Sequence, residues 1–205
     1  MISTDKKFLF IHIPKTGGNA IRLALKDHAI DEIVFNEKQQ AYNENNRQVH
    51  RFGIQNPYMD LKKHSHISEI HSKWDEQHLG AWEDYYKFAV VRNPWDRLVS
   101  LYFSPHKGNV DFDKKMFRDV IKNTKKGMQS VYLNENGKPV TDFLIRFESL
   151  ARDFSIVCDS LGIEAELPHV NMSRHLPYQE YYDNKTKKLV YKLYRDDIDQ
   201  FGYEF

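Results

Sequence analysis

Residues 8–25, FLFIHIPKTGGNAIRLAL, contain the pattern around which the rest of the chain is organised. The first six residues are rich in aromatic and β-branched side chains, and five of the six are strongly apolar, which predicts a strand buried on both faces. Pro14 then removes a backbone donor and ends this strand. Apolar side chains recur at helical spacing after the turn, at positions 20, 21, 24 and 25. The stretch therefore predicts a strand, a glycine turn and a helix.

The turn carries the chemistry of an anion-binding site. Gly17 and Gly18 allow the backbone to approach a ligand closely. A strand followed by a turn and a helix also points backbone N–H groups at an anion. Lys15, Thr16 and Asn19 add a cation, a hydroxyl and an amide at the same place. We expect phosphate binding here, and an ordinary turn with a surface lysine is the alternative.

Two familiar phosphate-binding patterns are absent from this turn. A Walker A loop, G-x-x-x-x-G-K-[ST], has its lysine after the glycines, whereas Lys15 precedes Gly17 and Gly18. The dinucleotide pattern G-x-G-x-x-G is also missing. The turn is therefore shorter than a Walker loop and has its lysine on the other side.

A second strand and turn repeat this arrangement. Residues 87–91, KFAVV, predict a buried strand that ends at Arg92. Asn93 is suited to cap the following helix, Pro94 to be its first residue, and Ser100 lies about two helical turns further on. Ligands of open α/β sheets bind outside the carboxyl ends of the strands, so both turns deliver polar groups to the same edge. The alternative for Arg92 is a structural salt bridge.

Three histidines, His64, His66 and His71, lie in residues 62–74, KKHSHISEIHSKW. No cysteine lies nearby and the set is not an HExxH pattern, so we expect no metal. Histidine titrates near neutral pH, and one on a loop entering a helix could be a general base. Surface histidines without a chemical role are the alternative.

The remaining chain gives weaker signals. Residues 31–35 predict a short strand, and residues 36–57 have no clear period and read as a polar excursion that could face a substrate. Asn136 and Gly137 predict a hairpin. Residues 143–147, FLIRF, continue it or start a strand, and the helix that follows ends at Gly162.

Composition limits the function classes. The 205 residues, 40% of them hydrophobic, suit a single domain over residues 1–205. A net charge of +1 gives no overall attraction to nucleic acid or an anionic membrane, and no apolar run is long enough for a membrane span. Cys158 is the only cysteine and no apolar leader precedes the first strand, so we expect a cytoplasmic protein. The sequence carries no signal for the oligomeric state.

The segments IHIPKTGGNAI and FAVVRNPWDRLVSLY resemble the two nucleotide motifs of sulfotransferases that use 3′-phosphoadenosine 5′-phosphosulfate (PAPS). The resemblance is to the carbohydrate-type (Sulfotransfer_2-like) family. It continues through KHSHISEI, FLIRFESL, LPHVNMSRH and the final FGYEF, and so covers nearly the whole chain. We therefore expect an α/β, P-loop-like three-layer fold in which helices flank a mainly parallel central sheet.

The resemblance implies a role for each motif. Lys15 would bridge the leaving phosphate oxygen and the sulfuryl group, while Arg92 and Ser100 would hold the 3′-phosphate. The donors to the 5′-phosphate would be Thr16, Gly17, Gly18 and Asn19. Asn19 departs from the Ser or Thr of many relatives but keeps a hydrogen-bonding side chain.

The resemblance also places a histidine base at His64. His66 competes with it, because a heparan 2-O-type relative uses an H-x-H arrangement. His12, Glu69 and His175 are the next candidates.

The expected reaction follows from these parts. By analogy with phosphoryl transfer, sulfuryl transfer is in-line and loose, and it needs positioning, a cation at the leaving oxygen and a base for the acceptor hydroxyl. A sulfuryl group carries less charge than a phosphoryl group, so no metal is required. We expect PAPS as co-substrate and a sugar or glycan hydroxyl as acceptor. The alternatives are a small nucleotide kinase and a non-catalytic module that binds a nucleotide or glycan.

Overall fold

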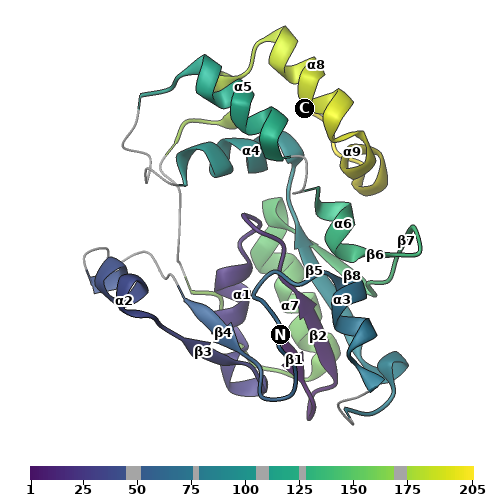
Figure 1. The fold of residues 1–205 in the computed structure, drawn as a ribbon. Helices are drawn as coiled ribbons and strands as arrows, with labels where there is room; N and C mark the ends of the chain where they lie inside the picture. The colour runs from purple at the N-terminus through teal and green to yellow at the C-terminus, as the bar shows by residue number, and fades with distance from the viewer. Residues whose placement is uncertain (45–51, 76–78, 105–110, 125–127, 169–174) are drawn as a thin grey trace.

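The computed structural model describes residues 1–44, 52–75, 79–104, 111–124, 128–168 and 175–205. Its central sheet has four strands in the order β1-β2-β5-β8. Their bounds are Ile2–Ser3 for β1, Phe8–Ile11 for β2, Tyr86–Val91 for β5 and Phe143–Arg146 for β8. β5 pairs in parallel with β2 and with β8, while β1 pairs antiparallel with β2. The prediction of a mainly parallel sheet is confirmed (Figure 1).

Helices cover both faces of this sheet. On one face, α1 (Gly18–Ala24) and α7 (Leu150–Leu161) pack on side chains that include Phe88 and Val90. On the other face, α3 (Ile67–Ser72) and α6 (Gln129–Leu133) pack on side chains that include Ala89 and Val91. Successive side chains of a strand point to opposite faces, so the continuous apolar run in β5 supplies both cores. The three layers expected from the sequence are present.

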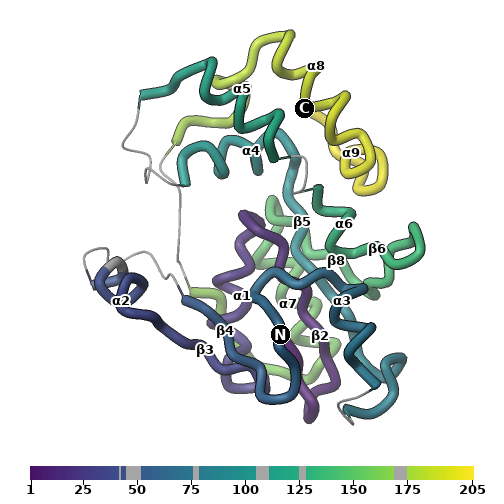
Figure 2. Tube along the Cα trace, viewed as in Figure 1, coloured from purple at the N-terminus to yellow at the C-terminus, as the bar shows by residue number. Residues whose placement is uncertain are grey.

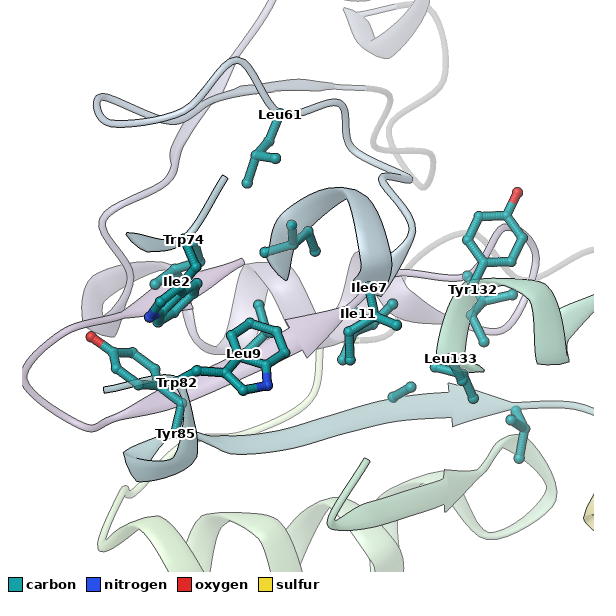
Figure 3. Packing of buried hydrophobic residues seen from close by; sticks show 14 of the residues in the cluster. Ile2, Leu9, Ile11, Leu61, Ile67, Trp74, Trp82, Tyr85, Tyr132 and Leu133 are labelled. Carbon is teal, nitrogen blue, oxygen red and sulfur yellow. The ribbon is translucent and has the colours of Figure 1, made fainter. Parts of the chain in front are cut away.

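The core on the α3 side contains large aromatic side chains (Figure 3). Trp74 packs edge-on against Trp82 and Tyr85, with ring centroids 4.9 Å and 4.6 Å away. Ile2 and Leu9 lie beside them on the sheet. Edge-to-face contacts of this kind add to the stability gained by apolar burial.

Four further helices group together at the end of β5 (Figure 1). They are α4 (Pro94–Phe103), α5 (Lys114–Asn123), α8 (Asn184–Leu193) and α9 (Arg195–Phe201). The side chain of Asn93 accepts a hydrogen bond from the backbone N–H of Trp95 and caps α4, as predicted. The carboxyl end of β5 therefore faces this helical group.

The segment after α1 differs from the sequence-based expectation. The predicted strand at residues 31–35 is present as β3 (Glu32–Val34), but it pairs with β4 (Gly53–Gln55) in a separate antiparallel sheet. Reading residues 36–57 as a polar surface excursion without secondary structure was wrong where α2 (Glu37–Glu44) and β4 form. Most of the side chains of α2 are polar, so the helix has no apolar stripe to reveal it. Residues 45–51 lie outside the described part of the chain.

The shorter elements agree with the sequence. β6 (Asn134–Glu135) and β7 (Lys138–Pro139) form the predicted hairpin, with positive φ at Asn136 and Gly137. Gly162 ends α7 in the left-handed conformation. The 3-10 helices with both ends in the described part of the chain include Lys26–His28, Trp82–Asp84, Phe147–Ser149 and Tyr178–Tyr181.

Buried polar contacts fix the residue at the end of β5. The side-chain amide of Gln129 accepts from the Arg92 N–H at 2.7 Å and donates to the Arg92 carbonyl at 2.8 Å. Asp197 in α9 accepts hydrogen bonds from the Gln129 N–H, the Ser130 N–H and the Ser130 hydroxyl. Asp197 also offsets the positive charge of buried Arg97. The last helix thereby sets the position of Arg92.

We expect Asp197→Ala to lower the free energy of unfolding by roughly 3–5 kcal/mol, because it leaves buried donors and a buried charge uncompensated. Urea unfolding followed by circular dichroism measures this loss. Asp199→Ala is the control: Asp199 pairs with Arg195 at the surface, and its loss should leave the unfolding midpoint unchanged. Equal effects of the two substitutions would contradict the structural role given to Asp197.

Candidate functional site

The backbone of the turn after β2, residues 14–18, has the conformation of an anion-binding site, which we call the anion cradle. Lys15 and Gly17 have positive φ angles of 69° and 86°. Thr16 is buried, and its hydroxyl donates to the carbonyl of Ile13 at 3.0 Å. Within the described residues, the N–H groups of Gly17 and Gly18 donate to no acceptor. Neighbouring N–H groups in a turn with left-handed residues make a concave site for anions.

Two arginines from the second motif hold the carbonyl oxygens of this turn. Arg97 Nε donates to the Pro14 carbonyl at 2.8 Å. Arg92 Nη1 donates to the Lys15 carbonyl at 3.2 Å. The sequence predicted that the two motifs meet at one edge of the sheet, and these contacts confirm that they do.

The Arg92 side chain is mostly buried and has further partners. Its Nε donates to Asp96 Oδ2 at 2.7 Å, and its guanidinium lies 3.9 Å from the centre of the Phe147 ring. The structural salt bridge considered for Arg92 is therefore present, together with the contact to the turn. Ser100 lies buried on α4, the helix that starts beside Arg92.

The side chain of Lys15 crosses from the turn to the end of α4. Its Nζ donates to the hydroxyl of Ser104 at 3.0 Å. Ser104 lies one helical turn beyond Ser100. The sequence did not predict a role for Ser104, although the spacing of four residues places both serines on the same side of the helix. Asn19 lies in the first turn of α1, beside the same cradle.

His64 lies next to the strand that leads into the turn. Its Nδ1 is 2.8 Å from the carbonyl oxygen of His12, and the two rings meet edge-on with centroids 4.5 Å apart. A carbonyl only accepts hydrogen bonds, so Nδ1 carries the proton and Nε2 is left as an acceptor. The pKa of His64 is lowered to about 4, chiefly by burial; the hydrogen bond to the His12 carbonyl opposes this effect, and the charges of Lys63, Arg22 and Arg97 add to it. His64 is thus uncharged at neutral pH.

The other histidines have different surroundings. The ring of His66 lies 4.4 Å from that of Tyr132 on α6. His71 stacks on Trp82 and bonds to Glu135 Oε1 at 2.7 Å, which indicates a structural role. His175 stacks on Phe103. Among the described residues no group of three or more His, Cys, Asp or Glu side chains is placed to hold a metal ion.

His12 contacts the helix that follows the turn. Arg22 Nε donates to His12 Nδ1 at 3.1 Å. The His12 ring also fills the space beside Gly18, where an added Cβ would lie 2.3 Å from His12 Cδ2. Burial first, and then the charge of Arg22, hold the pKa of His12 well below its ordinary value. The sequence indicated His12 only as a reserve candidate. It did not single out Arg22 or Arg97, because an arginine in a helix is usually exposed to solvent and nothing in the local pattern shows that these two are buried.

Comparison with known proteins gives the family. Residues 1–160 match the sulfotransferase family, and the chain belongs to it. The match includes the turn after β2, the histidine segment and the start of α4. No curated protein and no solved structure matches the chain. Family membership supports sulfuryl transfer as the general activity. None of the described helices is long and apolar enough to cross a membrane.

The close approach of His12 and Gly18 gives a prediction on stability. Gly18→Ala should cost about 1–3 kcal/mol of unfolding free energy, because the new methyl group overlaps the His12 ring. In a His12→Ala background the same change should be neutral or stabilise by up to about 1 kcal/mol, since alanine favours a helix over glycine. Urea unfolding of the four proteins of this double-mutant cycle measures the coupling. The same loss in both backgrounds would show that the contact is not made.

Proposed function

We propose that the protein transfers the sulfuryl group of PAPS to a hydroxyl of a carbohydrate acceptor. The observation that carries the proposal is the hydrogen bond from Arg92 Nη1 to the Lys15 carbonyl at 3.2 Å. It brings the motif proposed for the 5′-phosphosulfate and the motif proposed for the 3′-phosphate to one edge of the sheet. The P-loop-like topology, the PAPS donor and the glycan acceptor belong to this proposal and rest on the family.

The residues of the turn fit an anionic nucleotide. Gly17 and Gly18 present N–H groups without an acceptor in the described structure, and Thr16, Lys15 and Asn19 lie beside them. In this proposal these five residues hold the 5′ end of the nucleotide. Arg92, between β5 and α4, and Ser100, within α4, hold its 3′-phosphate. When bound, PAPS supplies the sulfuryl group to be transferred.

Lys15 is the proposed cation at the leaving oxygen. Its ammonium group already reaches from the turn to Ser104, so it spans the space between the two motifs. A charge placed there stabilises negative charge that grows during transfer more than the ground state. We expect Lys15→Ala to reduce kcat sharply with a smaller effect on nucleotide affinity. A near-normal kcat would remove Lys15 from this role.

His64 is the proposed general base. The His12 carbonyl fixes its proton on Nδ1, which leaves the Nε2 lone pair to accept the proton of an acceptor hydroxyl. A histidine with a lowered pKa is in this accepting form throughout the neutral range. His66 remains the competing candidate, with its ring against Tyr132 rather than against the strand that leads into the turn.

The single cysteine bears on where the protein is located. Cys158, the only cysteine of the sequence, is buried and forms no disulfide. A single free thiol fits a reducing compartment. We therefore propose a cytoplasmic location.

A transfer assay tests the proposed function. PAPS labelled at sulfur is incubated with the protein and a panel of glycans, and we expect label in a glycan and release of 3′-phosphoadenosine 5′-phosphate. ATP replaces PAPS in a parallel assay. Transfer of phosphate from ATP would instead support a nucleotide kinase, and nucleotide binding without any transfer would support a binding module.

The base assignment gives a prediction on pH. For the wild type, kcat/KM should be level between about pH 8 and 6 and fall only as the pH falls through about 4, because protonated His64 cannot accept a proton. His64→Ala should lose about 10²–10⁴ in kcat and lack this acidic limb. His66→Ala is the matched control and should keep both the activity and the limb. If His66→Ala is inactive and His64→Ala active, the base is His66.

A further inference from the structure

Arg22 is buried without full hydrogen bonding. It lies on α1 at 2% exposure, and its Nη2 donates to the Lys63 carbonyl at 3.4 Å. Its Nη1 is buried with no hydrogen-bond partner among the described residues. Burying a charge with an unsatisfied donor costs stability, and an apolar side chain of similar volume avoids that cost. The folded core alone therefore gives no reason for an arginine at this position.

The contacts of Arg22 lead to the proposed base in two steps. A guanidinium has donors only, so the hydrogen bond from Arg22 Nε makes His12 Nδ1 an acceptor and places the His12 proton on Nε2. The His12 ring then meets the His64 ring edge-on, while the His12 carbonyl accepts from His64 Nδ1. Residue 12 thus contacts His64 through both its side chain and its backbone. The segment between β4 and α3, which carries His64, lies beside β2 and α1 (Figure 2).

The charges around the two rings come from several elements. The basic groups that act on one or both histidines are Arg22 on α1, Lys63 next to His64, Arg97 on α4 and the amino group of Met1. Burial lowers the pKa of the Met1 amino group to about 5 and that of Lys63 to about 7, so the two arginines supply most of the positive charge at neutral pH. Asp31 is the acid whose charge acts on Arg22, and it accepts hydrogen bonds from the Ile2 N–H and from Asn56. Arg22 contributes to both histidines and touches one of them directly. Positive charge at this distance disfavours a second positive charge on either ring.

We propose that Arg22 is a positioning residue for His64, which it holds uncharged and correctly oriented through His12. The guanidinium locks His12 in the uncharged form with the proton on Nε2, and the two uncharged rings keep each other in place. His64 then presents Nε2 to an acceptor at neutral pH. The role in catalysis rests on the proposed function. The pairing, that is the contacts of Arg22 with His12 and of His12 with His64, is a property of the folded chain.

Nitrogen-edited NMR of the full chain, with its histidines labelled, tests the pairing without any substrate. In the wild type we expect His12 with its proton on Nε2, and His64 with its proton on Nδ1 and a titration midpoint near pH 4. In Arg22→Met, His12 should populate both tautomers and the His64 midpoint should rise, by less than the shift that burial causes, because Arg22 acts on His64 less than burial and Lys63 do. A folded Arg22→Met protein with unchanged tautomers and midpoint would overturn the proposal.

Arg22→Gln separates the hydrogen bond from the charge. Its side-chain amide can donate to His12 Nδ1, so the His12 tautomer should be kept while the His64 midpoint still rises. If Arg22→Met does not fold, this variant decides: an unchanged His64 midpoint would contradict the proposal. A merely structural role for Arg22 would alter thermal stability and leave the tautomers and the midpoint of the folded protein as they are.

Nucleotide binding separates this inference from the proposed function. Calorimetry with 3′-phosphoadenosine 5′-phosphate should give the same affinity for the wild type and Arg22→Gln, because Arg22 acts on the base and not on the nucleotide. If the wild type does not bind this nucleotide, the proposed function fails while the NMR result still decides the pairing. If affinity is lost only in Arg22→Gln, Arg22 acts on the turn and its role as a positioning residue is wrong.

Discussion

Two arginine contacts with the turn after β2 hold the candidate site together. Arg92 and Arg97 donate to the carbonyl oxygens of Lys15 and Pro14, at 3.2 Å and 2.8 Å. Cationic side chains from the second motif thereby bind the carbonyl oxygens, which are the electronegative ends of these peptide groups. The N–H groups of Gly17 and Gly18 are left without an acceptor in the described structure, which suits them to an external anion. In a chain of net charge +1, this positive character is local to the site.

The arginines are in turn held from the far end of the chain. The side chain of Gln129 bonds to both the N–H and the carbonyl of Arg92, and Asp197 on α9 accepts a hydrogen bond from the Gln129 N–H. The side chain of Asn93 donates to the carbonyl of Glu204 at 2.7 Å. The family match ends at residue 160, yet Asp197 and Glu204 lie beyond it. The last helix and the tail therefore help to position the site, although neither nucleotide motif lies in them.

The sequence predicted the parts of the site that depend on local pattern. A buried strand, a turn with glycines and a helix can be recognised within residues 8–25, and a parallel sheet brings the ends of such strands together. The contacts of Arg97 with Pro14 and of Asp197 with Gln129 could not be predicted, because they join residues 83 and 68 positions apart. α2 was missed for another reason, since a helix with exposed polar side chains shows no apolar period.

Calorimetric titration of the wild-type chain with 3′-phosphoadenosine 5′-phosphate and with ADP tests most directly whether the two motifs form one nucleotide site. Charge-assisted hydrogen bonds to a phosphate contribute roughly 1.5–3 kcal/mol each, so a 3′-phosphate held by Arg92 should give at least about tenfold tighter binding than ADP. Equal affinity for the two nucleotides, or binding of ADP alone, would contradict the account, because the second motif would then take no part in recognition.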